Sequence, residues 1–142
     1  MSSNVKVDVV FSSINHQLKH VTFNAIEEMH ENHSVIAENL ISTKHIDNNG
    51  FTLEAKKTLA LEPRGIFEGE IVFDIKCQFD QTTRKNFNGD IEAITRFIEK
   101  RKFEIFNRTE VGGLMSILLG QLTLIFNQRP IISAPFIEIK PD

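Results

Sequence analysis

Hydrophobic and polar positions alternate with a period of two residues through the first half of the chain. The run 66–79 is the clearest, and 51–61 repeats the pattern. This period places apolar side chains on one face of a β-strand. The short run 5–9 also alternates regularly, the run 14–25 alternates imperfectly, and 34–46 is a weaker strand candidate. The first half is therefore expected to form four or five antiparallel strands.

Two turn motifs separate the stronger strands. In "DNNG" (Asp47–Gly50) the Asn-Gly pair tolerates positive φ, so a hairpin with a type I′ turn is predicted. In "EPRG" (Glu62–Gly65) Pro63 fixes φ, which favours a second turn. Both motifs connect strands that neighbour each other along the chain.

The apolar spacing changes to three and four residues in the second half. Asp90 is a predicted N-cap, and the helical face after it consists of Ile91, Ile94, Phe97 and Ile98. The stretch 101–106 interrupts the pattern and predicts a loop or another short helical turn. Thr109 is expected to cap a longer helix over 111–126.

Glycines are expected to weaken this long helix and prolines to end it. Gly112, Gly113 and Gly120 lie inside it, and each costs about 1 kcal/mol relative to alanine. Their presence suggests a close helix neighbour, which another subunit could supply. Pro130 and Pro135 are expected to end the helix, and the chain should finish in extended form. Strands followed by helices predict one α+β domain over residues 1–142.

Composition excludes several classes of function. The net charge of −3 over 142 residues argues against a nucleic-acid partner. The single cysteine, Cys77, permits no internal disulfide and suits a reducing cytoplasm. The first ten residues do not resemble a signal peptide. The longest apolar segment is interrupted by Gly, Ser, Gln and Thr, so we expect no membrane insertion.

The order of these motifs resembles the SecB family of protein-export chaperones. The resemblance extends from about Ile14 to Ile139. "LKHVTFNA" resembles the family's first strand, "NGFTLEAKKTLAL" its third and "GIFEGEIVFDIKCQF" its fourth. "NRTEVGGLMSILLGQLTLIFNQRPIISAPFIEI" is similar to its long helix and the proline-containing segment after it. Order and spacing carry the resemblance, since no single motif is specific.

The resemblance implies a four-stranded antiparallel sheet with helices on one face. Subunits would pair through sheet edges and helices into a tetrameric dimer of dimers. The expected function is ATP-independent, cofactor-free binding of unfolded polypeptides in an apolar groove, in protein export. Phenylalanine and methionine offer adaptable apolar contacts. Our candidates for the groove are Phe97, Phe103, Phe106, Met115 and Leu119, which could instead form core and subunit interface.

The first strand of this chain differs from the family at a docking surface. In the family, acidic residues of the first and fourth strands contact the export motor SecA. Here His20 and Asn24 replace two of them, and only Asp74 stays acidic. The chain also ends at Asp142, without the family's final helix and tail. Since docking on a basic surface needs these charges, we expect no SecA partnership. A divergent chaperone of a particular client, such as an antitoxin-like protein, is favoured.

Other chemistry is weakly indicated. His30 and His33 in "HENH" have a spacing that could hold a metal, although no cysteine pair supports it. Cys77 alternates with apolar residues and is expected in the core. The run Lys100–Lys102 is expected to be solvated. With no phosphate loop or nucleophile elbow, enzymatic activity is not predicted. The alternatives are an adaptor that uses its apolar face on itself or on one partner, and a metal or small-ligand binder.

Overall fold

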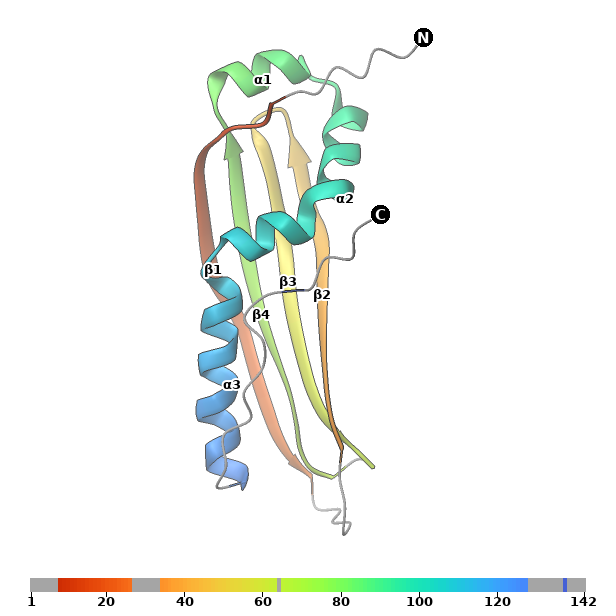
Figure 1. Cartoon of the computed structure of the whole chain (residues 1–142), viewed down its shortest axis with the longest axis vertical. Coiled ribbons are helices and arrows are strands. Elements are labelled where there is room, and N and C mark those ends of the chain that lie inside the picture. The colour runs from red at the N-terminus through yellow and green to blue at the C-terminus, as the bar shows by residue number, and fades with distance from the viewer. Residues whose placement is uncertain (1–7, 27–33, 64, 128–136, 138–142) are drawn as a thin grey trace.

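The chain forms one four-stranded antiparallel sheet followed by three helices. Our computed structural model describes residues 8–26, 34–63, 65–127 and 137. The strand order is β1-β4-β3-β2, with β1 (Phe11–Ile26), β2 (Ser34–Asp47), β3 (Gly50–Glu62) and β4 (Ile66–Phe79). The helices are α1 (Gln81–Phe87), α2 (Ile91–Arg108) and α3 (Val111–Asn127). In Figure 1, α2 and α3 lie on the same face of the sheet. The predicted α+β fold is confirmed.

The core lies between the two central strands and the helices. We call the covered side of the sheet the helix face and the other side the open face. Alternate residues of β3 and β4 point to the helix face and are buried, as their sequence pattern predicts. They are Phe51, Leu53, Ala55, Leu59, Leu61, Ile71, Phe73, Ile75, Cys77 and Phe79. Residues between them, such as Thr52 and Lys76, lie on the open face.

The predicted β2–β3 hairpin is present, but its turn is not type I′. Asp47 pairs with Gly50 across the two-residue loop, and Asn88 is the only non-glycine described residue with positive φ. The carboxylate Oδ1 of Asp47 instead accepts hydrogen bonds from Asn49 N at 2.7 Å and Gly50 N at 3.1 Å. Gly50 is required for space, because a Cβ there would lie 2.0 Å from the Cys77 carbonyl oxygen.

The edge strand β1 explains why its sequence alternates imperfectly. Its pairing with β4 shifts register between Leu18 and His20, so the facing pattern changes by one residue there. Leu18 and Val21 consequently share the helix face although they are three residues apart. The separate strand predicted over 5–9 lies largely outside the described residues. The second predicted turn follows Glu62, where the peptide bond to Pro63 is cis.

Helix α1 was not predicted from the sequence. Asp80 caps it by accepting a hydrogen bond from Thr83 N at 2.8 Å, and Asn88 ends it in the left-handed conformation. Phe87 is buried, and its ring centroid lies 5.2 Å from that of Phe79. The Asp80 cap and the Asn88-Gly89 pair were the sequence signals for a short helix between them.

Helix α2 is continuous, so the predicted interruption at 101–106 is wrong. Ile105 and Phe106 are buried with Ile94 and Ile98, which extends the helical face through this stretch. The pattern was obscured because Arg101 occupies a position of that face and pairs with Glu104. Two caps agree with prediction. Asp90 accepts from Ala93 N at 3.1 Å, and Thr109 ends α2 and accepts from Val111 N at 3.3 Å.

Candidate functional site

The outer edge of β1 is long and nearly uncharged. Strand β1 has 16 residues, of which only Lys19 is formally charged apart from the histidines. The other edge strand, β2, carries Glu38, Lys44 and Asp47. Charged residues on an edge strand discourage the addition of another strand. Edge β1 is therefore better suited than β2 to accept an extended polypeptide.

The helix face of β1 also exposes apolar side chains. Ile14, Leu18 and Val21 pair with buried residues of β4 yet remain 38%, 45% and 36% exposed. Helix α3 contacts β1 and β4 and runs beside β1 (Figure 1). Its side chains leave these three residues incompletely covered. Burial of such side chains would stabilise a complex by roughly 25 cal/mol for each Å² of apolar area.

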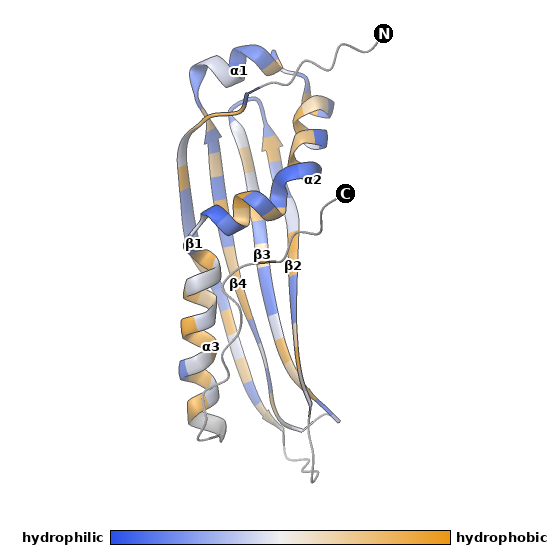
Figure 2. Cartoon of the chain, viewed as in Figure 1, coloured by the Kyte–Doolittle hydropathy of each residue, from blue (hydrophilic) through white to orange (hydrophobic). Residues whose placement is uncertain are grey.

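Helix α3 exposes further apolar side chains on the side away from the core. Met115 and Leu119 are buried against the core, whereas Ile117 and Leu124 are 59% and 51% exposed. A separation of seven residues places Ile117 and Leu124 on one helix face. Figure 2 shows apolar residues along the length of α3. We call Ile14, Leu18, Val21, Ile117 and Leu124 the β1–α3 apolar surface.

The five predicted groove residues are divided between core and surface. Phe106, Met115 and Leu119 are 2% exposed or less and contact the chain's own core. Phe97 is half-buried, with its ring centroid 6.2 Å from that of Phe87. Phe103 is exposed, and Lys102 Nζ lies 5.5 Å from its ring. The assignment of these five residues to a peptide groove stays a prediction.

The sequence analysis missed the β1–α3 apolar surface. The sequence predicted a long helix over 111–126 but did not single out Ile117 or Leu124. Their signal was that α3 is apolar on more than one face, which exceeds what packing on one sheet requires. For Ile14 and Leu18 the sequence showed apolar alternation, but not that this strand would lie at an edge.

The predicted docking residue His20 lies on the open face in a group of mixed charge. His20 Nε2 and Lys56 Nζ each lie 3.5 Å from an oxygen of Glu70. Asn24 is exposed and pairs in register with Glu68. The resemblance to SecB implied an acidic docking surface on this face. The face instead combines the carboxylate of Glu70 with the imidazole of His20 and the amide of Asn24.

The third predicted docking residue, Asp74, is neutralised by lysines. Its Oδ2 lies 2.9 Å from Lys44 Nζ and 4.0 Å from Lys19 Nζ. Its Oδ1 is buried, and no donor among the described residues reaches it. A basic partner would have to compete with these lysines for Asp74. The docking role of His20, Asn24 and Asp74 stays a prediction.

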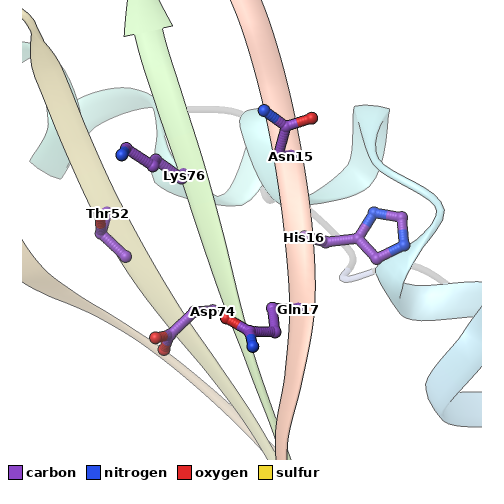
Figure 3. Close-up of a pocket in the computed structure, with 6 residues that line it drawn as sticks. All are labelled: Asn15, His16, Gln17, Thr52, Asp74 and Lys76. Atoms are coloured by element: carbon purple, nitrogen blue, oxygen red, sulfur yellow. The ribbon is translucent and has the colours of Figure 1, made fainter.

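A shallow cavity of about 410 Å³ lies beside Asp74. Figure 3 shows Lys76 and Asp74 on β4 with Asn15 and Gln17 on the neighbouring β1, while His16 points away from them. The remaining lining residue is Thr52. All six lining residues have polar or charged side chains, whereas an apolar peptide groove is lined mainly by hydrophobic and aromatic residues.

Two ionisable side chains, Cys77 and Lys57, are buried on the helix face and cannot react with or bind molecules at the surface. Cys77 is fully buried, as predicted, and burial raises the pKa of its thiol to about 12. A protonated, inaccessible thiol is a poor nucleophile. Lys57 is also buried on this face, and desolvation lowers the pKa of its ammonium group. Both groups are therefore part of the core.

Two further sequence features concern metals and membranes. His30 and His33 lie outside the described residues. Within the described ranges, no three His, Cys, Asp or Glu side chains are grouped so that they could bind a metal ion. In that same part of the chain, no helix has the length and apolar character needed to cross a membrane.

Comparison with known proteins finds a structural relative but no sequence relative. No family model and no curated protein matches the chain. The solved structure of the Mycobacterium tuberculosis Rv1957 SecB-like chaperone, in complex with a ChAD peptide from the Rv1956 HigA1 antitoxin, is similar in fold. The match covers 94% of this chain and 93% of that one, with a TM-score of 0.58 and 9% sequence identity. The chain therefore has a SecB-like fold.

Proposed function

We propose that the chain is an ATP-independent, non-enzymatic chaperone that binds unfolded polypeptides. The observation that carries this proposal is the β1–α3 apolar surface beside a nearly uncharged strand edge. An unfolded chain offers apolar side chains and unpaired backbone groups at the same time. A surface with both apolar area and a free strand edge complements it without requiring a particular sequence.

The similar structure supports the same class of ligand. The Rv1957 SecB-like chaperone was solved with a peptide from an antitoxin. A shared fold at 9% identity does not transfer the client, so the proposal concerns polypeptide binding as a class. We propose that it acts in the cytoplasm, because a chain with a single cysteine suits a reducing compartment.

We further propose that the chain assembles into a tetramer, a dimer of dimers. Subunits would associate through a sheet edge and through their helices. Apolar area of this extent on β1 and α3 favours association. Clients would then use the part of the β1–α3 apolar surface that the subunits leave uncovered.

A role in SecA-dependent export is not part of the proposal. The open face offers Asp74 only as a partner of Lys44 and Lys19, and Glu70 only beside His20 and Lys56. Attraction of a basic partner is weakened when acids are already compensated by neighbouring cations. An export role through another contact stays a prediction from the SecB resemblance.

The alternative function is an adaptor for one dedicated partner. It is favoured by one specific observation, namely that the similar chaperone was solved with a peptide of one named protein. An adaptor would use the same apolar surface but would add contacts that select one sequence. General chaperone activity would then be absent.

Aggregation suppression separates the two functions. Several unrelated proteins are diluted from denaturant in the presence of micromolar amounts of this chain, without nucleotide, and light scattering is followed. The chaperone proposal predicts reduced scattering for several clients at near-stoichiometric amounts. Failure with every client would contradict it and leave the adaptor.

A further inference from the structure

The side-chain amide of Asn107 binds both polar backbone groups of one distant residue. Asn107 Nδ2 donates to the Ile137 carbonyl oxygen at 2.8 Å, and Ile137 N donates to Asn107 Oδ1 at 2.7 Å. Asn107 lies in the last turn of α2, and Ile137 is partly buried against the hydrophobic core. One amide therefore satisfies a complete backbone unit from elsewhere in the chain.

This contact has the hydrogen-bond pattern of an antiparallel strand pair. A residue points its N–H and C=O to the same side when its backbone is extended, and facing residues in a hydrogen-bonded pair exchange two such bonds. The Asn107 amide replaces one of those residues. Because both bonds go to the backbone of Ile137, any extended residue other than proline could make them.

Apolar contacts accompany this backbone contact. Phe103 precedes Asn107 by four residues, which places both on one side of α2, and its side chain is 38% exposed. Ile137 adds its own apolar side chain to the core. The region thus combines sequence-independent backbone recognition with apolar area, which are the two properties that an unfolded client requires.

We propose that Asn107 is a binding site for an extended apolar polypeptide, and that Ile137 of the same chain occupies it until a client displaces it. The proposal rests on the polypeptide-binding function proposed above. Its ligand is a client segment with an apolar residue at the position of Ile137. Ile137 competes with the client for Asn107. When no client is bound, Ile137 makes both hydrogen bonds to the Asn107 amide.

Two substitutions distinguish this role from a structural tether. Asn107→Leu keeps a similar volume but removes both amide groups, whereas Ile137→Pro removes the backbone donor of the competitor. If the contact only tethers the chain, Asn107→Leu loses both hydrogen bonds and Ile137→Pro loses the one donated by Ile137 N, so both variants weaken the same tether and change peptide affinity in the same direction. If Ile137 competes with clients, Ile137→Pro frees the site and Asn107→Leu destroys it, so the two changes are opposite.

The measurement is the fluorescence anisotropy of a labelled peptide with alternating apolar residues, titrated with the full chain. We expect Ile137→Pro to tighten binding about fivefold and Asn107→Leu to weaken it about fivefold, the effect of one net hydrogen bond. Ile137→Ser, which keeps the N–H but loses the apolar side chain, should also tighten binding. If thermal melting shows that Ile137→Pro is unfolded, Ile137→Ser takes its place in the comparison.

Each outcome decides between the two proposals. Opposite changes in affinity support the Asn107 site. Changes of affinity in the same direction, or no change, overturn the Asn107 site. The general function survives in that case if the wild-type chain still suppresses aggregation. Absence of peptide binding by every variant, together with no suppression of aggregation, would overturn the proposed function itself.

Discussion

At the scale of single residues, side-chain carboxylates determine where elements of this fold begin and turn. Asp80 and Asp90 each accept a hydrogen bond from the third residue after them and so start α1 and α2. Asp47 accepts two backbone hydrogen bonds in the β2–β3 turn. A deprotonated carboxylate is the stronger acceptor, so each contact depends on charge as well as position.

Asp47 gives a pH-dependent prediction. The hydrogen bond from Asn49 N is the main cause that lowers the pKa of Asp47, with smaller contributions from His45 and Gly50. Because the folded pKa of Asp47 lies below the ordinary aspartate value of 3.8, its stabilisation is fully present above that pH. It is lost as pH falls through the lower folded value. Asp47→Ala should therefore reduce the free energy of unfolding by about 1 kcal/mol at neutral pH.

Urea denaturation of both proteins at neutral and acidic pH measures this effect. The stability difference between wild type and Asp47→Ala should narrow as the pH falls below about 4. Glu38→Ala is the control, since Glu38 is exposed on the edge strand β2. A difference that stays constant or widens on acidification would show that the Asp47 charge does not stabilise the turn.

At the scale of elements, regular apolar periodicity predicted strands and helices correctly, whereas interruptions of the pattern led to wrong element boundaries. The buried faces of β3 and β4 followed directly from alternation. The break predicted at 101–106 came from Arg101, whose long side chain can occupy a helical face while its charged end reaches Glu104. The apolar character of α3 on more than one face indicated that some apolar side chains would be exposed, but which ones could not be predicted, because the side of α3 that meets the sheet depends on contacts distant in sequence.

The glycines of α3 provide a prediction at this scale. A Cβ added at Gly113 would meet nothing within 4 Å. Gly113→Ala should therefore raise the free energy of unfolding by about 0.5 to 1 kcal/mol, because alanine loses less backbone entropy in a helix. Gly50→Ala is the opposing control and should destabilise the fold, given the close Cys77 carbonyl.

Urea titrations at several protein concentrations test both substitutions. Destabilisation by Gly113→Ala would contradict the expectation from the single chain. It would indicate that a second subunit packs closely at Gly113, as the glycine content of this helix first suggested.

At the scale of the whole molecule, the two faces of the sheet have different properties. The helix face holds the core and extends to the β1–α3 apolar surface, while the open face carries compensated charges such as Asp74 with Lys44. Family resemblance in the sequence predicted the element order and the sheet. The resemblance did not locate the exposed apolar area. Three of the five groove candidates that it suggested are core residues in the folded chain.

The proposed assembly predicts a particle of four chains. Light scattering after size exclusion should give a mass near four times 16.2 kDa at micromolar concentration. The physical reason is that association removes part of the exposed apolar area from water and pairs a sheet edge, while the rest of the apolar area stays open to clients. A monomer at every concentration measured would contradict this assembly.

The most direct test of the central claim compares two equally exposed apolar residues on opposite faces. Ile117 belongs to the β1–α3 apolar surface and Leu40 lies on the open face, and each is 59% exposed. Aggregation of an unfolded client is measured with Ile117→Ser, Leu40→Ser and wild type at equal concentration. Our account predicts that Ile117→Ser loses most of its suppression while Leu40→Ser retains it. Equal activity of the two variants, or loss only in Leu40→Ser, would contradict the proposal that clients bind at the β1–α3 apolar surface.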